Sequence, residues 1–174
     1  MNWIPPDFGP VEDLMLGIFR RWFDGQSVSV LSEFEEHMSL PAVVVRADRR
    51  SGLAAFHTTS DDRFARASVV SISVFCNGPA GNGLNADKQA SQLAESCTLA
   101  MRTAVSEQWV IPRAGHLSVI DNSTPFMRAQ DWQTSTSVVQ YASLPDGTVR
   151  YEAVYRILFR PPVEGSGNPF LPNL

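Results

Sequence analysis

The feature that most constrains the fold is the segment 67–107, where an alternating stretch, a glycine-rich connection and a long helical pattern follow one another. Residues 67–76 alternate small polar with apolar side chains, which is the pattern of a β-strand with one buried face. The connection 77–83 contains three glycines and a proline, and neither a helix nor a strand tolerates such a run. Asn85 then fits a helix N-cap, with Asp87 in the first turn, where the helix dipole favours a carboxylate.

The helical pattern that follows has one buried stripe. Small and apolar residues recur at three- and four-residue steps, which predicts a helix about 35 Å long. The stripe consists of Ala86, Ala90, Leu93, Ala94, Cys97, Met101, Ala104 and Val105. Because alanine dominates the stripe, the helix can closely approach whatever it covers. We expect it to pack on a sheet that contains the preceding strand.

Further elements are expected on both sides of this segment. A helix of about four turns is predicted to begin at Pro10, with Glu12 and Asp13 in its first turn, and to end near Gly25. Strands are predicted within 27–34, 40–46, 116–120 and 149–159, of which the last shows the clearest alternation. A turn region containing Pro125 is expected over 121–130. Residues 138–143 are expected to form a hairpin with the last strand.

These elements predict an α+β fold with a mostly antiparallel β-sheet of four to five strands, on which the N-terminal helix and one long central helix pack. The 174 residues, of which 44% are apolar, suit one domain with a sizeable core. We expect this domain to span residues 10–160, with a long polar loop over 46–64. An extended N-terminal arm is expected over 1–9, and a proline-rich C-terminal arm over 161–174.

No pattern of catalytic or ligand-binding residues emerges from the sequence. The connection 77–83 lacks the lysine and hydroxyl of a nucleotide P-loop and the glycine spacing of a dinucleotide fingerprint, and there is no Gly-x-Ser-x-Gly motif. Three histidines lie far apart without a partner at metal-ligand spacing, namely His37, His57 and His116. We therefore expect no catalytic residue, no cofactor and no metal. Metal binding by the adjacent Asp61 and Asp62 is a minor alternative.

Bulk properties exclude further classes of function. The net charge of −4 gives no general attraction to a polyanion. The longest apolar runs are too short to cross a bilayer, and no basic stretch precedes an apolar one at the N-terminus, so we expect neither a membrane span nor a signal peptide. Cys76 and Cys97 fall on apolar faces of different elements. Buried free thiols are the favoured interpretation, and a disulfide is the alternative.

Two groups of residues are candidates for contacts with other subunits or partners. Apolar side chains in the proline-rich ends suggest segments that dock on a neighbour, and these are Trp3, Phe8, Phe170 and Leu171. Mixed charges in and beside the long polar loop suit salt bridges between subunits, and these are Arg46, Asp48, Arg49, Arg50, Asp61, Asp62 and Arg63. A nucleic-acid patch at the arginines of 46–50 is the weaker alternative, because Asp48 lies among them.

The order of elements over residues 10–160 resembles the tail terminator and tail-completion proteins of long-tailed bacteriophages, particularly those of actinobacterial hosts. The resemblance rests on the Leu-Pro-Ala-Val-Val-Val-Arg strand at 40–46, and on the helix that opens Asn-Ala-Asp-Lys-Gln-Ala-Ser-Gln-Leu-Ala-Glu at 85–95. It also rests on the Tyr-Glu-Ala-Val-Tyr-Arg-Ile strand at 151–157.

The resemblance implies a structural virion protein and not an enzyme. Such a protein would form a homohexameric ring that caps the tail tube and joins it to the neck of the head. The implied partners are the tail tube protein, a neck or head-completion protein, and genomic DNA that passes through the lumen without specific binding. The implied location is the tail–neck junction of the virion, after assembly in the host cytoplasm. A net negative subunit suits a DNA conduit, because a positive lumen would bind phosphates.

Two alternatives to this function remain open. A neck stopper or head–tail adaptor belongs to the same structural class and would contact the portal side. A small α+β ligand-binding protein or enzyme that uses the 77–83 connection belongs to a different class.

Overall fold

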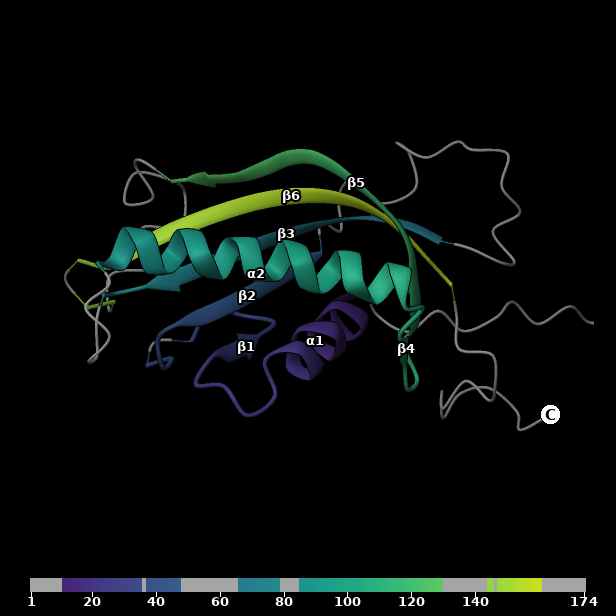
Figure 1. Cartoon of the computed structure of the whole chain (residues 1–174), viewed down its shortest axis with the longest axis horizontal. Helices are drawn as coiled ribbons and strands as arrows, with labels where there is room; N and C mark the ends of the chain where they lie inside the picture. Colours follow the sequence, from purple (N-terminus) through teal and green to yellow (C-terminus); the bar gives the residue numbers. More distant parts are fainter. Residues whose placement is uncertain are drawn as a thin grey trace, which may run out of the picture.

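The computed structural model describes residues 11–35, 37–47, 66–78, 85–129, 144–145 and 147–160. Its two described helices, α1 (Val11–Trp22) and α2 (Ala86–Ser106), pack on a mixed β-sheet, so the fold is α+β as predicted (Figure 1). The described strands are β1 (Ser29–Leu31), β2 (Ala42–Ala47), β3 (Arg66–Cys76), β4 (Val110–Ile111), β5 (Gly115–Arg128) and β6 (Val149–Arg160).

The strands follow the order β1-β2-β3-β6-β5-β4 across one sheet. Only β1 and β2 run parallel, and the other pairs are antiparallel. The six described strands exceed the four to five that the sequence predicted. The centre is the long pairing of β3 with β6, which joins segments about 80 residues apart and brings Val70 beside Tyr155.

Both helices lie on the same face of the sheet, with α2 running along the strands and α1 beside it (Figure 1). Side chains from alternate positions of β3 and β6 fill the space beneath them, as the period-two pattern predicted. These buried residues are Val70, Ile72, Val74, Cys76, Ala153, Tyr155, Ile157 and Phe159. The predicted stripe of α2 faces this core, and its residues Ala90, Ala94 and Ala104 are all buried. The side chain of Asn85 accepts a hydrogen bond from the Lys88 amide at 2.8 Å, which confirms the predicted N-cap.

The helix α1 links the two edges of the curled sheet. It contacts β1 and β2 at one edge, and β4 and β5 at the other. Close approach to β4 requires a residue without a side chain at position 17, because a Cβ atom there would overlap Cγ2 of Ile111. The packing of α1 against β4 therefore requires glycine at position 17, although glycine is a poor helix former.

The predictions for residues 110–128 were partly wrong. β5 continues through residues 121–128, where a turn was expected, and the short strand β4 was not predicted at all. The register of β5 against β6 shifts at three places, between Leu117 and Val119, between Asn122 and Thr124, and between Thr124 and Met127. Such bulges accommodate Pro125 and break the alternation on which a sequence prediction depends. The predicted strand at 138–143, both terminal arms and most of the predicted polar loop lie outside the described residues.

Candidate interaction surface

The face of the sheet opposite the helices carries no described helix, and we call it the open face. Its partly or fully exposed apolar residues are Ala67, Val69, Val119, Met127, Val154 and Leu158. Val119 is 50% exposed and Met127 is 61% exposed. The strand register aligns Ala67, Leu158 and Val119 across β3, β6 and β5, so part of this set is contiguous. Contiguous exposed apolar side chains are typical of a surface that contacts another protein.

Charged side chains lie among these apolar residues. Arg46 of β2, Arg156 and Arg160 of β6, and Asp121 of β5 are exposed on the open face. Asp121 lies directly opposite Arg156 in the strand register, whereas Arg46 lies opposite Ser71. The exposed charges on the strands of this face are three arginines and one carboxylate, and the chain between β1 and β2, at one end of the face, adds the exposed Glu33 and Glu35.

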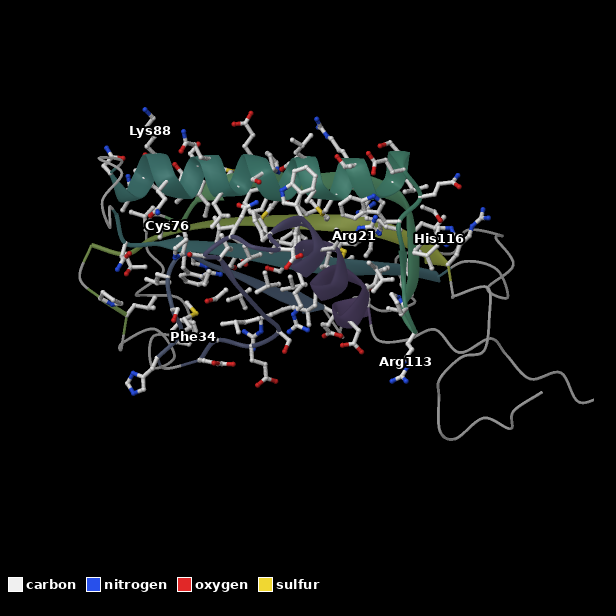
Figure 2. The ribbon with its side chains drawn as sticks, turned by 60° about the horizontal axis from the view of Figure 1, so that its bottom comes forward. Arg21, Phe34, Cys76, Lys88, Arg113 and His116 are labelled. Carbon is white, nitrogen blue, oxygen red and sulfur yellow. The ribbon has the colours of Figure 1, made fainter. Side chains whose placement is uncertain are left out.

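One end of the open face is covered by the chain between β1 and β2. There Phe34 lies with its ring centroid 5.9 Å from that of Phe75. Met38, Ala42 and Val44 complete this small second core. Figure 2 shows Phe34 on the side of the sheet away from α2, so the second core lies opposite the main one.

A partly buried ion pair lies beside this second core. The Arg150 guanidinium donates to Oε2 of Glu152 at 2.7 Å and to the Ser73 hydroxyl at 3.3 Å. The Ser71 hydroxyl donates to the other carboxylate oxygen of Glu152 at 2.7 Å. Because Arg150 is only 9% exposed, these hydrogen-bond partners replace much of the water that would otherwise stabilise its charge.

At the far end of the same face, the pKa of His116 is lowered from 6.5 by burial and by the nearby Arg160 guanidinium. Figure 2 shows His116 at the end of the sheet where β5 begins. The folded protein therefore binds the imidazole proton less tightly than the unfolded chain does.

We expect this difference to appear as a pH dependence of stability. Because the folded pKa is the lower one, the contribution of His116 is constant above about pH 7 and decreases as the pH falls through the unfolded pKa of about 6.5. Urea denaturation of the wild type and of His116→Gln, from about pH 5 to pH 8, measures it. The free-energy difference between the two proteins should shift in favour of His116→Gln below about pH 6.5, and a constant difference would contradict the assignment.

The two cysteines are free and buried, as predicted. Burial raises the pKa of Cys76 to about 12. Burial also raises the pKa of Cys97, and the neighbouring Cys76 adds to this effect. Figure 2 places Cys76 between the sheet and α2. Neither thiol lies in the electropositive, partly exposed surroundings of a reactive cysteine.

We expect both thiols to be protected from a disulfide reagent such as DTNB in the native protein near pH 8, because the reagent needs an accessible thiolate. After denaturation in guanidinium chloride, both thiols should react at once. The absorbance at the end of each reaction gives the number of thiols that have reacted. Rapid reaction of even one thiol under native conditions would show that the α2–sheet contact opens readily.

The N-terminus of α2 is occupied by groups of the chain itself. The Tyr151 hydroxyl donates to Oδ1 of Asp87 at 3.2 Å, and Arg128 lies 3.2 Å from the same oxygen. Desolvation and the Asp87 charge raise the pKa of Tyr151. With Asn85 and Asp87 both at this terminus, the described residues supply it with hydrogen-bond acceptors and one negative charge. The remainder of the connection considered for ligand binding, residues 79–83, lies outside the described part.

Of the candidate contact residues named from the sequence, the structure describes only Arg46, which is exposed on the open face. The others lie outside the described residues: Trp3, Phe8, Asp48, Arg49, Arg50, Asp61, Asp62, Arg63, Phe170 and Leu171. Sequence analysis did not select Val119, Met127 or Arg160 as surface residues. The alternation of β6 indicated which side chains share a face, but not that both described helices would pack on the opposite face.

In the described part of the chain, no group of three or more histidine, cysteine, aspartate or glutamate side chains could hold a metal ion. None of its helices combines the length and apolarity needed to cross a membrane. In comparisons with known proteins, no family model matches this chain, and no curated protein matches its sequence.

Proposed function

We propose that this protein is a structural virion protein that forms a ring at the end of a bacteriophage tail tube and joins the tube to the neck of the head. Two things support the proposal. The order of sequence elements resembles that of tail terminator and tail-completion proteins. The α+β fold, with helices on one face of a sheet, is compatible with that family.

The open face is the observation that carries the proposal. It combines exposed apolar side chains, such as Val119 and Met127, with exposed arginines at positions 46, 156 and 160. An apolar area with charged surroundings is the composition of a protein–protein contact. A ring of identical subunits needs a heterologous contact, in which one surface of each copy meets a different surface of the next. The proposed ring is a hexamer located at the tail–neck junction of the virion.

Binding to isolated phage parts tests this function. Purified protein should bind the ends of tail tubes assembled from the tail tube protein, and tubes made without it should vary in length. Electron microscopy of tubes with and without the added protein measures both effects. Failure to bind tubes, or tubes of unchanged length distribution, would contradict the proposal. Binding only to DNA-filled, tailless heads would instead favour the neck stopper or adaptor function.

A further inference from the structure

The strand β6 brings the chain to the open face and ends there. It lies between β3 and β5 in the sheet, and its side chains at positions 154, 156, 158 and 160 lie on the open face. Residues 161–174 follow directly after Arg160, so they begin beside this face. Residues 1–10, in contrast, lead into α1, which packs on the other face of the sheet (Figure 1). Of these two segments outside the described residues, 161–174 is therefore the one that begins next to the open face.

The sequence of residues 161–174 contains a short apolar anchor. Two prolines come first, residues 164–168 include two glycines and a serine, and Phe170 and Leu171 then follow between Pro169 and Pro172. Proline restricts the backbone of an unbound segment, so that ordering the segment on a surface costs less conformational entropy. A segment that only has to stay in solvent needs neither a phenylalanine nor a leucine. This composition favours docking on an apolar surface.

The open face offers such a surface at the end where β6 stops. Ala67 of β3, Leu158 of β6 and Val119 of β5 lie side by side in the strand register, and we call these three residues the apolar row. Val119 is 50% exposed, and Ala67 and Leu158 are half-buried. Accessible apolar side chains aligned across three strands suit contact with a short apolar segment.

Two arginines flank the apolar row. Arg156 precedes Leu158 by two residues and Arg160 follows it by two, so the three side chains share one face of β6, and both arginines are exposed. Asp121 lies opposite Arg156, while the exposed carboxylates of the chain between β1 and β2 lie at the other end of the face. The only charged side chain in residues 161–174 is Glu164. The segment therefore brings a carboxylate towards these arginines and no cation that they would repel.

We propose that residues 161–174 of one copy dock on the open face of the next copy, with Phe170 and Leu171 against the apolar row. This inference rests on the proposed ring and deepens it, because it names the two sides of the heterologous contact. Each copy gives its segment to one neighbour and receives the segment of the other, so the same contact repeats until the ring closes.

Proline also directs the segment towards a neighbour. Arg160 and Pro161 each precede a proline, which disfavours a helical backbone at both residues and favours an extended one. An extended chain continues along β6 past the end of the sheet, away from the apolar row of its own copy. The residues between β6 and Phe170 can then span up to about 30 Å. This reach suffices for a second copy placed against that end of the sheet.

Two full-length variants test the two sides of the contact. Variant A, Phe170→Ser with Leu171→Ser, removes the anchor and alters no described residue. Variant B, Val119→Thr with Leu158→Thr, removes the large apolar side chains of the row and introduces a residue with high strand propensity. Leu99→Gln is the matched control, because Leu99 is 52% exposed but lies on α2, on the other side of the sheet.

Light scattering after size-exclusion chromatography gives the mass of each preparation. We expect the wild type and Leu99→Gln to assemble equally, and variants A and B alone to assemble at least about tenfold more weakly. An equimolar mixture of A and B should form particles of two chains, because the intact row of A accepts the intact segment of B. A segment that docks on its own chain would give no such particles.

A fluorescent peptide with the sequence of residues 161–174 measures the same contact without assembly. Fluorescence anisotropy should show saturable binding of this peptide to variant A, and at least about tenfold weaker binding to variant B. The peptide with serine at both anchor positions should not bind variant A. Thermal melting followed by circular dichroism establishes that both variants are folded.

Three results would overturn the inference. The first is assembly of variant A or variant B as strong as that of the wild type; if variant B then also loses binding to tail tubes, the open face contacts the tube instead. The second is a mixture of folded A and B without two-chain particles. The third is equal binding of the peptide to both variants. The proposed function fails separately, if the wild type assembles through this contact but does not bind tail tubes.

Discussion

Replacing Gly17 with valine is expected to lower the free energy of unfolding by about 3 kcal/mol, which is a fall in melting temperature of about 6–12 °C for a domain of this size. A Cβ atom at residue 17 would overlap Cγ2 of Ile111, and the Cβ of Ile111 also lies only 3.4 Å away. Valine adds two further methyl groups, and its branched side chain has few rotamers in a helix with which to avoid the clash. Either α1 or β4 must therefore move.

A double-mutant cycle isolates this contact. Gly17→Val combined with Ile111→Ala should cost at least about 1 kcal/mol less than the sum of the two single changes, because the alanine makes room for the valine. Urea denaturation followed by circular dichroism measures all four proteins. If Gly17→Val is as stable as the wild type, or if the two single changes are strictly additive, then a side chain at position 17 does not clash with Ile111, which would contradict this account.

Replacing Glu152 with alanine is expected to lower the free energy of unfolding by about 2 kcal/mol, the second large effect, since the ion pair is partly buried. The change removes the acceptor of the 2.7 Å bond from Arg150, whose guanidinium is 9% exposed and loses this carboxylate as a counter-charge. It also removes the acceptor of the Ser71 hydroxyl. The cost arises from the loss of the counter-charge beside a buried guanidinium more than from the lost bond itself.

A variant that removes both charges is the matched control. Arg150→Met with Glu152→Leu approximately keeps the volume and removes the ion pair altogether, so we expect a change of less than about 1 kcal/mol. Chemical denaturation at neutral pH compares the single and double variants. Equal losses in both would mean that packing against Phe75, and not the buried charge, determines the stability of this end of the sheet.

Much of the fold could be predicted from local patterns. The strands at β3 and β6 and the helix α2 follow from period-two alternation, an alanine-rich stripe and the Asn85 cap. The outer part of β5 could not be predicted, because three register shifts and Pro125 erase the alternation while the backbone remains paired with β6. The role of Gly17 could not be predicted either. The side chain that leaves no room for a Cβ atom at position 17 is that of Ile111, which is about 90 residues away in sequence.

The candidate surface depends on contacts that local patterns do not contain. The arginines of β6 could be assigned to one face from their spacing. That this face is open depends on both helices packing on the other side, and on β6 lying between β3 and β5. Arg46 was selected for its charged sequence neighbours, and the structure places it on the same face for a different reason, its pairing opposite Ser71.

Negative-stain electron microscopy of the purified wild-type protein tests the central claim most directly. The account predicts closed rings of several copies. Particles the size of a single 19.2 kDa chain, at every protein concentration and in low salt, would contradict it.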